Sequence, residues 1–290
     1  MKVGLSSYSV VRLLEEGTLS ILDLPQWIKE HGGEHLELAP LGYSLLDDPQ
    51  LADQLRIRAD EAGIELSNYC ISANFVQSTR AAFEEEVERV KKHVDLAARL
   101  RIPYVRHDVT GFSKEPGEIS IGYFERVLPE LVEGSRCIAD YAATFGITTS
   151  IENHGFCVQA SDRVRRVVEE VDRANFRTTL DVGNFLCVDE QPWVGVMNNI
   201  SLASVVHFKD FYIRPYDQPP GEGPWFQSTH GNYLRGAILG QGDLNIPRLV
   251  KIVKDAGYDG YVTVEFEGIE DSFTGSRIGM DNLKRMWNEA

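Results

Sequence analysis

Four short strand-like segments in the second half of the chain each carry a potential metal ligand at or near their carboxyl end. These residues are Glu152, Asp181, His207 and Glu265. A charge at the tip of an apolar strand costs free energy unless something pairs with it. Three carboxylates meeting at one point would also repel one another without a cation. We therefore expect these four residues to bind one divalent metal ion.

The chemistry of the four side chains indicates which metals suit the site. Three carboxylates and one imidazole form a fairly hard ligand set, which suits Mn²⁺, Mg²⁺ or Co²⁺, with Zn²⁺ and Fe²⁺ as alternatives. We expect Mn²⁺ first. Each residue alone is weak evidence, because a strand-end Asp commonly caps a helix or forms a turn. Their occurrence on successive strands, at the same end, favours the metal site.

The elements that must position these residues form a regular alternation of strand and helix. Strands are expected at 3–8, 35–38, 64–71, 102–106, 147–152, 176–181, 204–208 and 261–266. Helices are expected at 21–31, 49–62, 81–100, 121–145, 162–174, 194–202, 246–256 and 276–288. Eight such units in 290 residues favour an α/β fold closed into a single (β/α)8 TIM barrel. Active sites of such barrels lie at the carboxyl ends of the strands.

No linker or shift in composition divides the chain, so we expect one domain over residues 1–290. The connection at about 210–245, after the seventh strand, is long and rich in proline, glycine and aromatic residues. A loop of this length in a compact barrel is usually a lid or a binding loop. An ordered decoration or an oligomer contact is the alternative.

Composition limits the classes of partner. The formal net charge of −15 argues against binding to nucleic acid. No stretch is apolar over the roughly 18 residues that a membrane span needs, and the N-terminus lacks the apolar region of a signal peptide. The four cysteines show no metal or redox spacing, as expected in a reducing compartment. We expect a soluble cytoplasmic protein with a small-molecule substrate, and a homo-oligomer remains open.

Several motifs resemble those of the sugar phosphate isomerase/epimerase superfamily, which includes relatives of tagatose epimerase, hydroxypyruvate isomerase and inosose dehydratase. They are Ser150–Gly155, Leu180–Asn184, His207–Asp210, Gly240–Asp243 and Gly257–Glu265. The resemblance covers nearly the whole chain. It implies a xylose isomerase-like barrel and a divalent metal on the four residues named above. It also implies a small carbohydrate substrate: a sugar, a sugar phosphate or a related α-hydroxy ketone.

The resemblance further implies that Glu152 and Glu265 are catalytic and lie on opposite faces of a bound ketose. One glutamate would remove the proton next to the carbonyl, the metal would stabilise the enediolate, and a returned proton would complete isomerisation or epimerisation. Asn184 departs from the ketohexose epimerases, which carry a histidine there. Asparagine cannot act as an acid near neutral pH. A metal-dependent dehydratase of an inosose-like keto-polyol is therefore the alternative.

Five residues near the same end of the barrel are expected to contact substrate: His107, His154, Asn184, Lys209 and Arg214. Each also has a purely structural interpretation, such as a turn or an ion pair. Two further function classes stay open. A nuclease resembling endonuclease IV is remote, because such sites gather many histidines and this chain has seven in all. A non-catalytic sugar-binding protein would retain metal without turnover.

Overall fold

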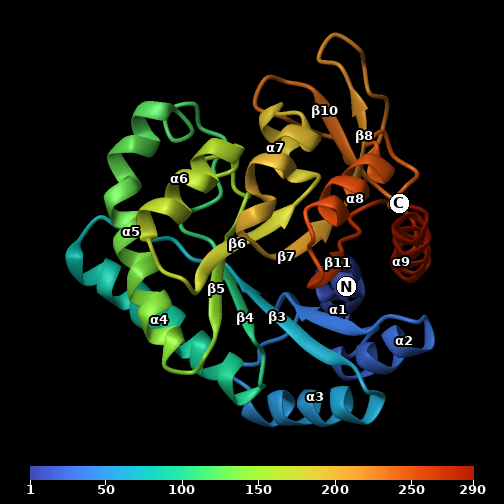
Figure 1. Ribbon diagram of the computed structural model, residues 1–290, viewed down its shortest axis with the longest axis horizontal. Helices are drawn as coiled ribbons and strands as arrows, with labels where there is room; N and C mark the ends of the chain where they lie inside the picture. The colour runs from blue at the N-terminus through green and yellow to red at the C-terminus, as the bar shows by residue number, and fades with distance from the viewer.

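The structure, a computed structural model, describes residues 1–290 and confirms the closed parallel barrel (Figure 1). Its strands are β1 (Lys2–Ser6), β2 (His35–Leu38), β3 (Glu65–Ile71), β4 (Tyr104–His107), β5 (Thr148–Glu152), β6 (Phe176–Asp181), β7 (Ala203–Phe208) and β11 (Tyr261–Val264). Around the barrel they follow the order β1-β11-β7-β6-β5-β4-β3-β2. Strands β5, β6, β7 and β11 are therefore consecutive neighbours, which brings their carboxyl ends together.

Helices cover the outside of the barrel (Figure 1). They are α1 (Val11–Glu15), α2 (Leu24–Glu30), α3 (Pro49–Ala62), α4 (Arg80–Arg99), α5 (Ile121–Ala143), α6 (Ser161–Val171), α7 (Pro192–Asn199), α8 (Ile246–Asp255) and α9 (Ser272–Glu289). Short 3-10 helices lie at Ser7–Val10, Ile21–Asp23, Asn184–Val188 and Ile200–Leu202. In α4, Phe83, Val87, Val90 and Val94 are buried, as their spacing predicts for a helix with one face on the barrel.

Several helix boundaries differ by a few residues from those expected. Helix α9 begins four residues earlier than predicted, because the Asp271 carboxylate accepts a hydrogen bond from the Thr274 amide at 2.8 Å and caps the helix at that point. Helix α7 ends at Asn199, and the chain continues as a 3-10 turn before β7. No helix is both long and apolar enough to cross a membrane.

The segment 210–245 contains regular structure that the sequence patterns did not reveal. Strands β8 (Asp210–Arg214), β9 (Phe226–Gln227) and β10 (Tyr233–Ala237) form a small antiparallel sheet in the order β8-β10-β9. The buried carboxylate of Asp210 accepts hydrogen bonds from the amides of Gly240, Gly242 and Leu244 at 2.9–3.2 Å. The Asp210 side chain thus connects the start of the segment 210–245 to its end.

Candidate metal centre and its cavity

The structure brings together the four residues expected to bind a metal. One ligand atom from each of Glu152, Asp181, His207 and Glu265 lies within 4.8 Å of the others. Backbone pairing explains part of this arrangement, since Asp181 lies beside His207 in the register of β6 and β7. The Glu265 amide, one residue beyond β11, still donates to the Phe208 carbonyl of β7 at 3.1 Å.

The local chain conformation orients Asp181. Its Oδ1 accepts hydrogen bonds from the amides of Gly183 and Asn184, both at 2.7 Å, so Oδ2 is turned toward the other ligands. Neither Asp181 Oδ2 nor His207 Nδ1 has a hydrogen-bond partner, although both atoms are buried. Buried polar atoms are normally satisfied, and a divalent cation among these donors would satisfy both. The residues present therefore fit a metal site.

Lys209 is a buried cation that contacts two of the four proposed ligands. Its Nζ lies 2.9 Å from Glu265 Oε2 and 3.3 Å from Asp181 Oδ2, and its side chain is 6% exposed. Gly183 leaves room for the lysine stem, because a Cβ at that position would lie 2.6 Å from Lys209 Cγ. Despite burial, Lys209 and His207 lower the pKa of Glu265 to about 2. Glu265 is therefore held as a carboxylate.

The pKa values of Asp181 and His207 are shifted upward, whereas that of Glu265 is shifted downward. Burial, reinforced by the charges of Glu152 and Glu265, raises the pKa of Asp181 to about 7 in spite of Lys209. Burial opposes the charged form of His207, but the carboxylates of Glu37 and Glu265 raise the pKa of His207 to about 10. Such strong mutual perturbation of buried groups is typical of functional sites.

A second group of polar residues surrounds Glu152. Arg106 Nη2 lies 2.8 Å from Glu152 Oε2 and 2.9 Å from Asp108 Oδ1. The side-chain amide of Asn184 donates a hydrogen bond to Glu152 Oε1 at 2.9 Å. His154 Nδ1 lies 3.4 Å from the same Asp108 oxygen. Both oxygens of Glu152 are thus engaged, and its side chain is held toward the centre.

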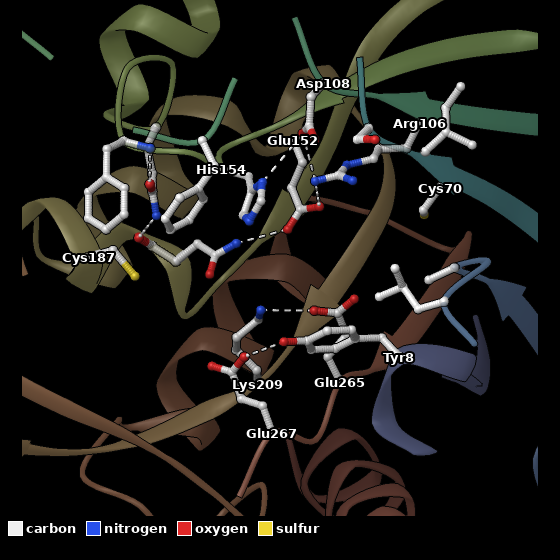
Figure 2. Close-up of a pocket in the computed structure, with 18 of the residues that line it drawn as sticks. Tyr8, Cys70, Arg106, Asp108, Glu152, His154, Cys187, Lys209, Glu265 and Glu267 are labelled. Atoms are coloured by element: carbon white, nitrogen blue, oxygen red, sulfur yellow. Dashed lines mark hydrogen bonds and ion pairs between the residues drawn. The ribbon is translucent and has the colours of Figure 1, made fainter. Parts of the chain in front are cut away.

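A cavity of about 600 Å³ opens over these residues. Glu152, with Arg106 and His154, lies on one side in Figure 2, and Glu265, with Lys209, lies on the other. Asn184 also lines the cavity, so three of the five expected substrate contacts, His154, Asn184 and Lys209, do reach it. Asp181 and His207 are buried at 0% exposure beneath them.

His107 and Arg214 require correction, because neither lines the cavity. The His107 ring packs against Phe75 and Phe176, with centroids 5.6 and 6.0 Å away, on the outer side of β4. Arg214 lies at the end of β8, where its guanidinium contacts the carboxylate of Asp243 at 3.4 Å. The structure therefore places both side chains outside the cavity that His154, Asn184 and Lys209 line.

Several cavity residues were not anticipated. Successive side chains of a strand point to opposite faces. Arg106 therefore faces the barrel interior, whereas its neighbour His107 faces the helices. Tyr8, just after β1, donates a hydrogen bond to Glu267 at 3.3 Å, and both line the cavity. Glu37 of β2 contacts His207 from beneath. Strict alternation from the neighbouring strand residues would have indicated Arg106, but no short motif marks the others.

The comparisons with known proteins agree with the barrel fold described above. Residues 25–286 match the model of a family described as xylose isomerase-like TIM barrel. A probable 3-DHS dehydratase from Bacillus anthracis, involved in petrobactin synthesis, is 18% identical with a TM-score of 0.76, covering 98% of this chain and 99% of that one. A 3-keto-D-glucoside 4-epimerase from E. coli is 16% identical with a TM-score of 0.73, covering 98% and 99%.

One further structure, an IOLI protein with a bound zinc atom, is 17% identical with a TM-score of 0.74, covering 100% of this chain and 99% of that one. At identities this low, these similarities establish a shared fold. They do not transfer an activity.

Proposed function

Because this chain belongs to the xylose isomerase-like TIM barrel family, we propose that it is a divalent-metal-dependent isomerase or epimerase of a small sugar, sugar phosphate or related α-hydroxy ketone. One observation carries the proposal: Glu152 and Glu265 approach the same point from different strands, together with Asp181 and His207. The cavity of about 600 Å³ above them has the size of a small-molecule site.

Glu152, Asp181, His207 and Glu265 would hold the metal. When bound there, a divalent cation would polarise a substrate carbonyl and stabilise negative charge on its oxygen. We propose Mn²⁺ as the working metal, with Mg²⁺, Co²⁺ and Zn²⁺ as alternatives, because carboxylates dominate the ligand set.

The two glutamates are suited to move a proton on a carbon next to that carbonyl. Glu265 is held in its ionised form by Lys209, so it can accept a proton. Glu152, fixed by Arg106 and Asn184, lies on the other side of the cavity and would face a substrate bound between the two glutamates. Proton removal on one face and return on the other inverts the carbon, whereas return to the adjacent carbon isomerises the ketose.

Dehydration is the second candidate, and the pair formed by His154 and Asp108 favours it. His154 lines the cavity, and against the effect of burial the hydrogen bond and charge of Asp108 raise the pKa of His154. A histidine whose protonated form is favoured in this way could give its proton to a departing β-hydroxyl. The C–H electrons would then form the new C=C bond as the C–O bond breaks, and water would leave. Asn184, which cannot supply this proton, is compatible with either reaction.

One experiment separates these reactions. The purified protein would be loaded in turn with Mn²⁺, Mg²⁺, Co²⁺ and Zn²⁺, and incubated with a panel of ketoses and inososes in D₂O. We expect NMR to show deuterium at a carbon next to the carbonyl of a reactive substrate. An isomer or epimer of equal mass supports the first function, whereas loss of water supports the second. Absence of exchange with every metal and substrate, in protein shown to bind metal, would contradict both.

A further inference from the structure

His207 has a hydrogen-bond partner on a barrel strand that is not its neighbour. Its Nε2 lies 2.7 Å from Glu37 Oε2, and both side chains are at most 1% exposed. Glu37 belongs to β2, and strands β1 and β11 separate β2 from β7. The contact therefore crosses the barrel interior. Asn68 of β3 donates to the same Glu37 oxygen at 2.9 Å and fixes the carboxylate in place.

A carboxylate oxygen only accepts, so the nitrogen facing Glu37 must carry the hydrogen. When the imidazole is neutral, its lone pair then lies on Nδ1. That atom is buried without a hydrogen-bond partner, 3.4 Å from Glu265 Oε1 and 3.9 Å from Glu152 Oε1. The nitrogen left free by Glu37 is thus the one that lies near the carboxylates of Glu265 and Glu152.

We propose that Glu37 is a positioning residue, which fixes the tautomer and rotation of His207 so that the imidazole binds the metal through Nδ1. The inference rests on the proposed metal-dependent function and adds to it a residue outside the ligand set. Partners of this kind raise the basicity of a ligating histidine and hold its ring in one orientation. The role also accounts for a fully buried carboxylate, which would otherwise be costly.

Glu37 could instead be a ligand of a second metal site, but the geometry is less consistent with that role. Glu37, Cys70 and His207 also bring possible ligand atoms within 4.8 Å of one another. A cation held there would need His207 Nε2, and the 2.7 Å hydrogen bond to Glu37 already engages that nitrogen. The Cys70 thiol in turn accepts from the Asn68 amide at 3.4 Å. These contacts describe a support for His207 rather than a second metal site.

The first test uses the wild-type protein loaded with Zn²⁺, a diamagnetic probe. Long-range ¹H–¹⁵N spectra of the histidine rings, assigned with His207→Gln, distinguish a metal on Nδ1 from one on Nε2. We expect the metal on Nδ1 and a hydrogen on Nε2 that exchanges slowly with solvent. Binding through Nε2 would overturn the proposal. This measurement needs no Glu37 variant, so it decides the matter even if such a variant fails to fold.

The second test measures Mn²⁺ and Zn²⁺ affinity by titration calorimetry on metal-free protein. Glu37→Gln should weaken binding by about 10- to 100-fold, the usual effect of removing such a partner. In the same variant, the ring hydrogen of His207 should exchange faster. Glu190→Gln is the matched control, because Glu190 is a carboxylate that accepts from the Ser161 amide at 2.8 Å outside the site. It should retain wild-type affinity.

The two levels of inference fail in different ways. If the wild-type protein binds neither ion, the proposed metal-dependent function is wrong. If the wild type binds metal and folded Glu37→Gln binds it equally well, with unchanged ring spectra for His207, the metal site stands and the positioning role of Glu37 is wrong.

Discussion

Arg106 joins a buried and a half-buried carboxylate with a single nitrogen: its Nη2 lies 2.8 Å from Glu152 Oε2 and 2.9 Å from Asp108 Oδ1. Because the Arg106 side chain is only about 10% exposed, its positive charge and the negative charges of Glu152 and Asp108 stabilise one another. Burial opposes charge on Asp108, yet Arg106 and His154 hold the pKa of Asp108 below its usual range. Arg106 is thus expected to contribute to stability as well as to the orientation of Glu152.

Replacing Arg106 by methionine should destabilise the protein by about 3–5 kcal/mol, because removal of one partner leaves buried charges without compensation. Urea unfolding would measure the change. The exposed pair of Arg99 and Asp53, at 2.7 Å, provides the control, and Arg99→Met should change stability much less. Equal effects of the two substitutions would show that Arg106 is not an essential counter-charge.

Asp181→Asn should abolish tight binding of a divalent metal. The amide retains an oxygen that can accept from Gly183 and Asn184, but the negative charge at the ligand position is lost. We expect affinity for Mn²⁺ to fall by more than about 100-fold, since loss of a mere supporting partner already costs 10- to 100-fold. Titration calorimetry and elemental analysis of purified protein would measure it. Asp140→Asn, at the exposed ion pair with Arg173, should leave metal content unchanged.

Lys209→Met should separate metal binding from catalysis. The Lys209 ammonium lies close to two proposed ligands, Asp181 and Glu265, so its charge opposes a bound cation. Two unit charges about 4 Å apart interact by about 4 kcal/mol at an effective dielectric constant of about 20. We therefore expect metal affinity to rise by at least about tenfold.

Turnover of the same variant should fall by about 100-fold or more, as on loss of other preorganised charges near a reacting oxygen. Calorimetry and the deuterium-exchange assay would be performed on the same folded preparation. Weaker metal binding in Lys209→Met would show that the lysine supports the ligands rather than competes with the cation.

The convergence of the four proposed ligands could be predicted from sequence because it depends on a general property of the fold. Parallel strands of a barrel end at the same face, so Glu152, Asp181, His207 and Glu265 had to lie near one another once the βα repeat was recognised. The apolar runs also located every barrel strand to within a few residues.

The remaining features depend on distances that local patterns do not encode. Glu37 reaches His207 across 170 residues of sequence, and the contact exists only because the barrel closes. The strand-end pattern points to His107, whereas its neighbour Arg106 lines the cavity, because a shift of one residue reverses the face of a strand. Prolines and glycines obscure the strand pattern of the sheet β8-β10-β9, and the contact between Asp210 and Gly240 spans 30 residues of sequence.

Asp189 offers a test of how that sheet is attached. Its carboxylate accepts hydrogen bonds from the His230 amide and the Asn232 side chain, both at 2.8 Å, and so ties the turn after β6 to the residues before β10. Burial alone would raise the pKa of Asp189, but hydrogen bonds from Ser228, Asn232 and His230 hold it below its usual range. The folded state therefore favours the ionised form.

A carboxylate with a depressed folded pKa stabilises the protein above its unfolded pKa of about 3.9, and this contribution disappears as pH falls through the folded value. Asp189→Asn should cost about 1–3 kcal/mol at pH 7, because hydrogen bonds to a charged acceptor are weakened. Residue 189 has a φ of +58°, which asparagine tolerates, so backbone strain should not contribute. Urea unfolding of both proteins between pH 7 and pH 3 should show the difference shrinking below about pH 4. A difference that stays constant over this range would show that the charge of Asp189 does not stabilise the attachment.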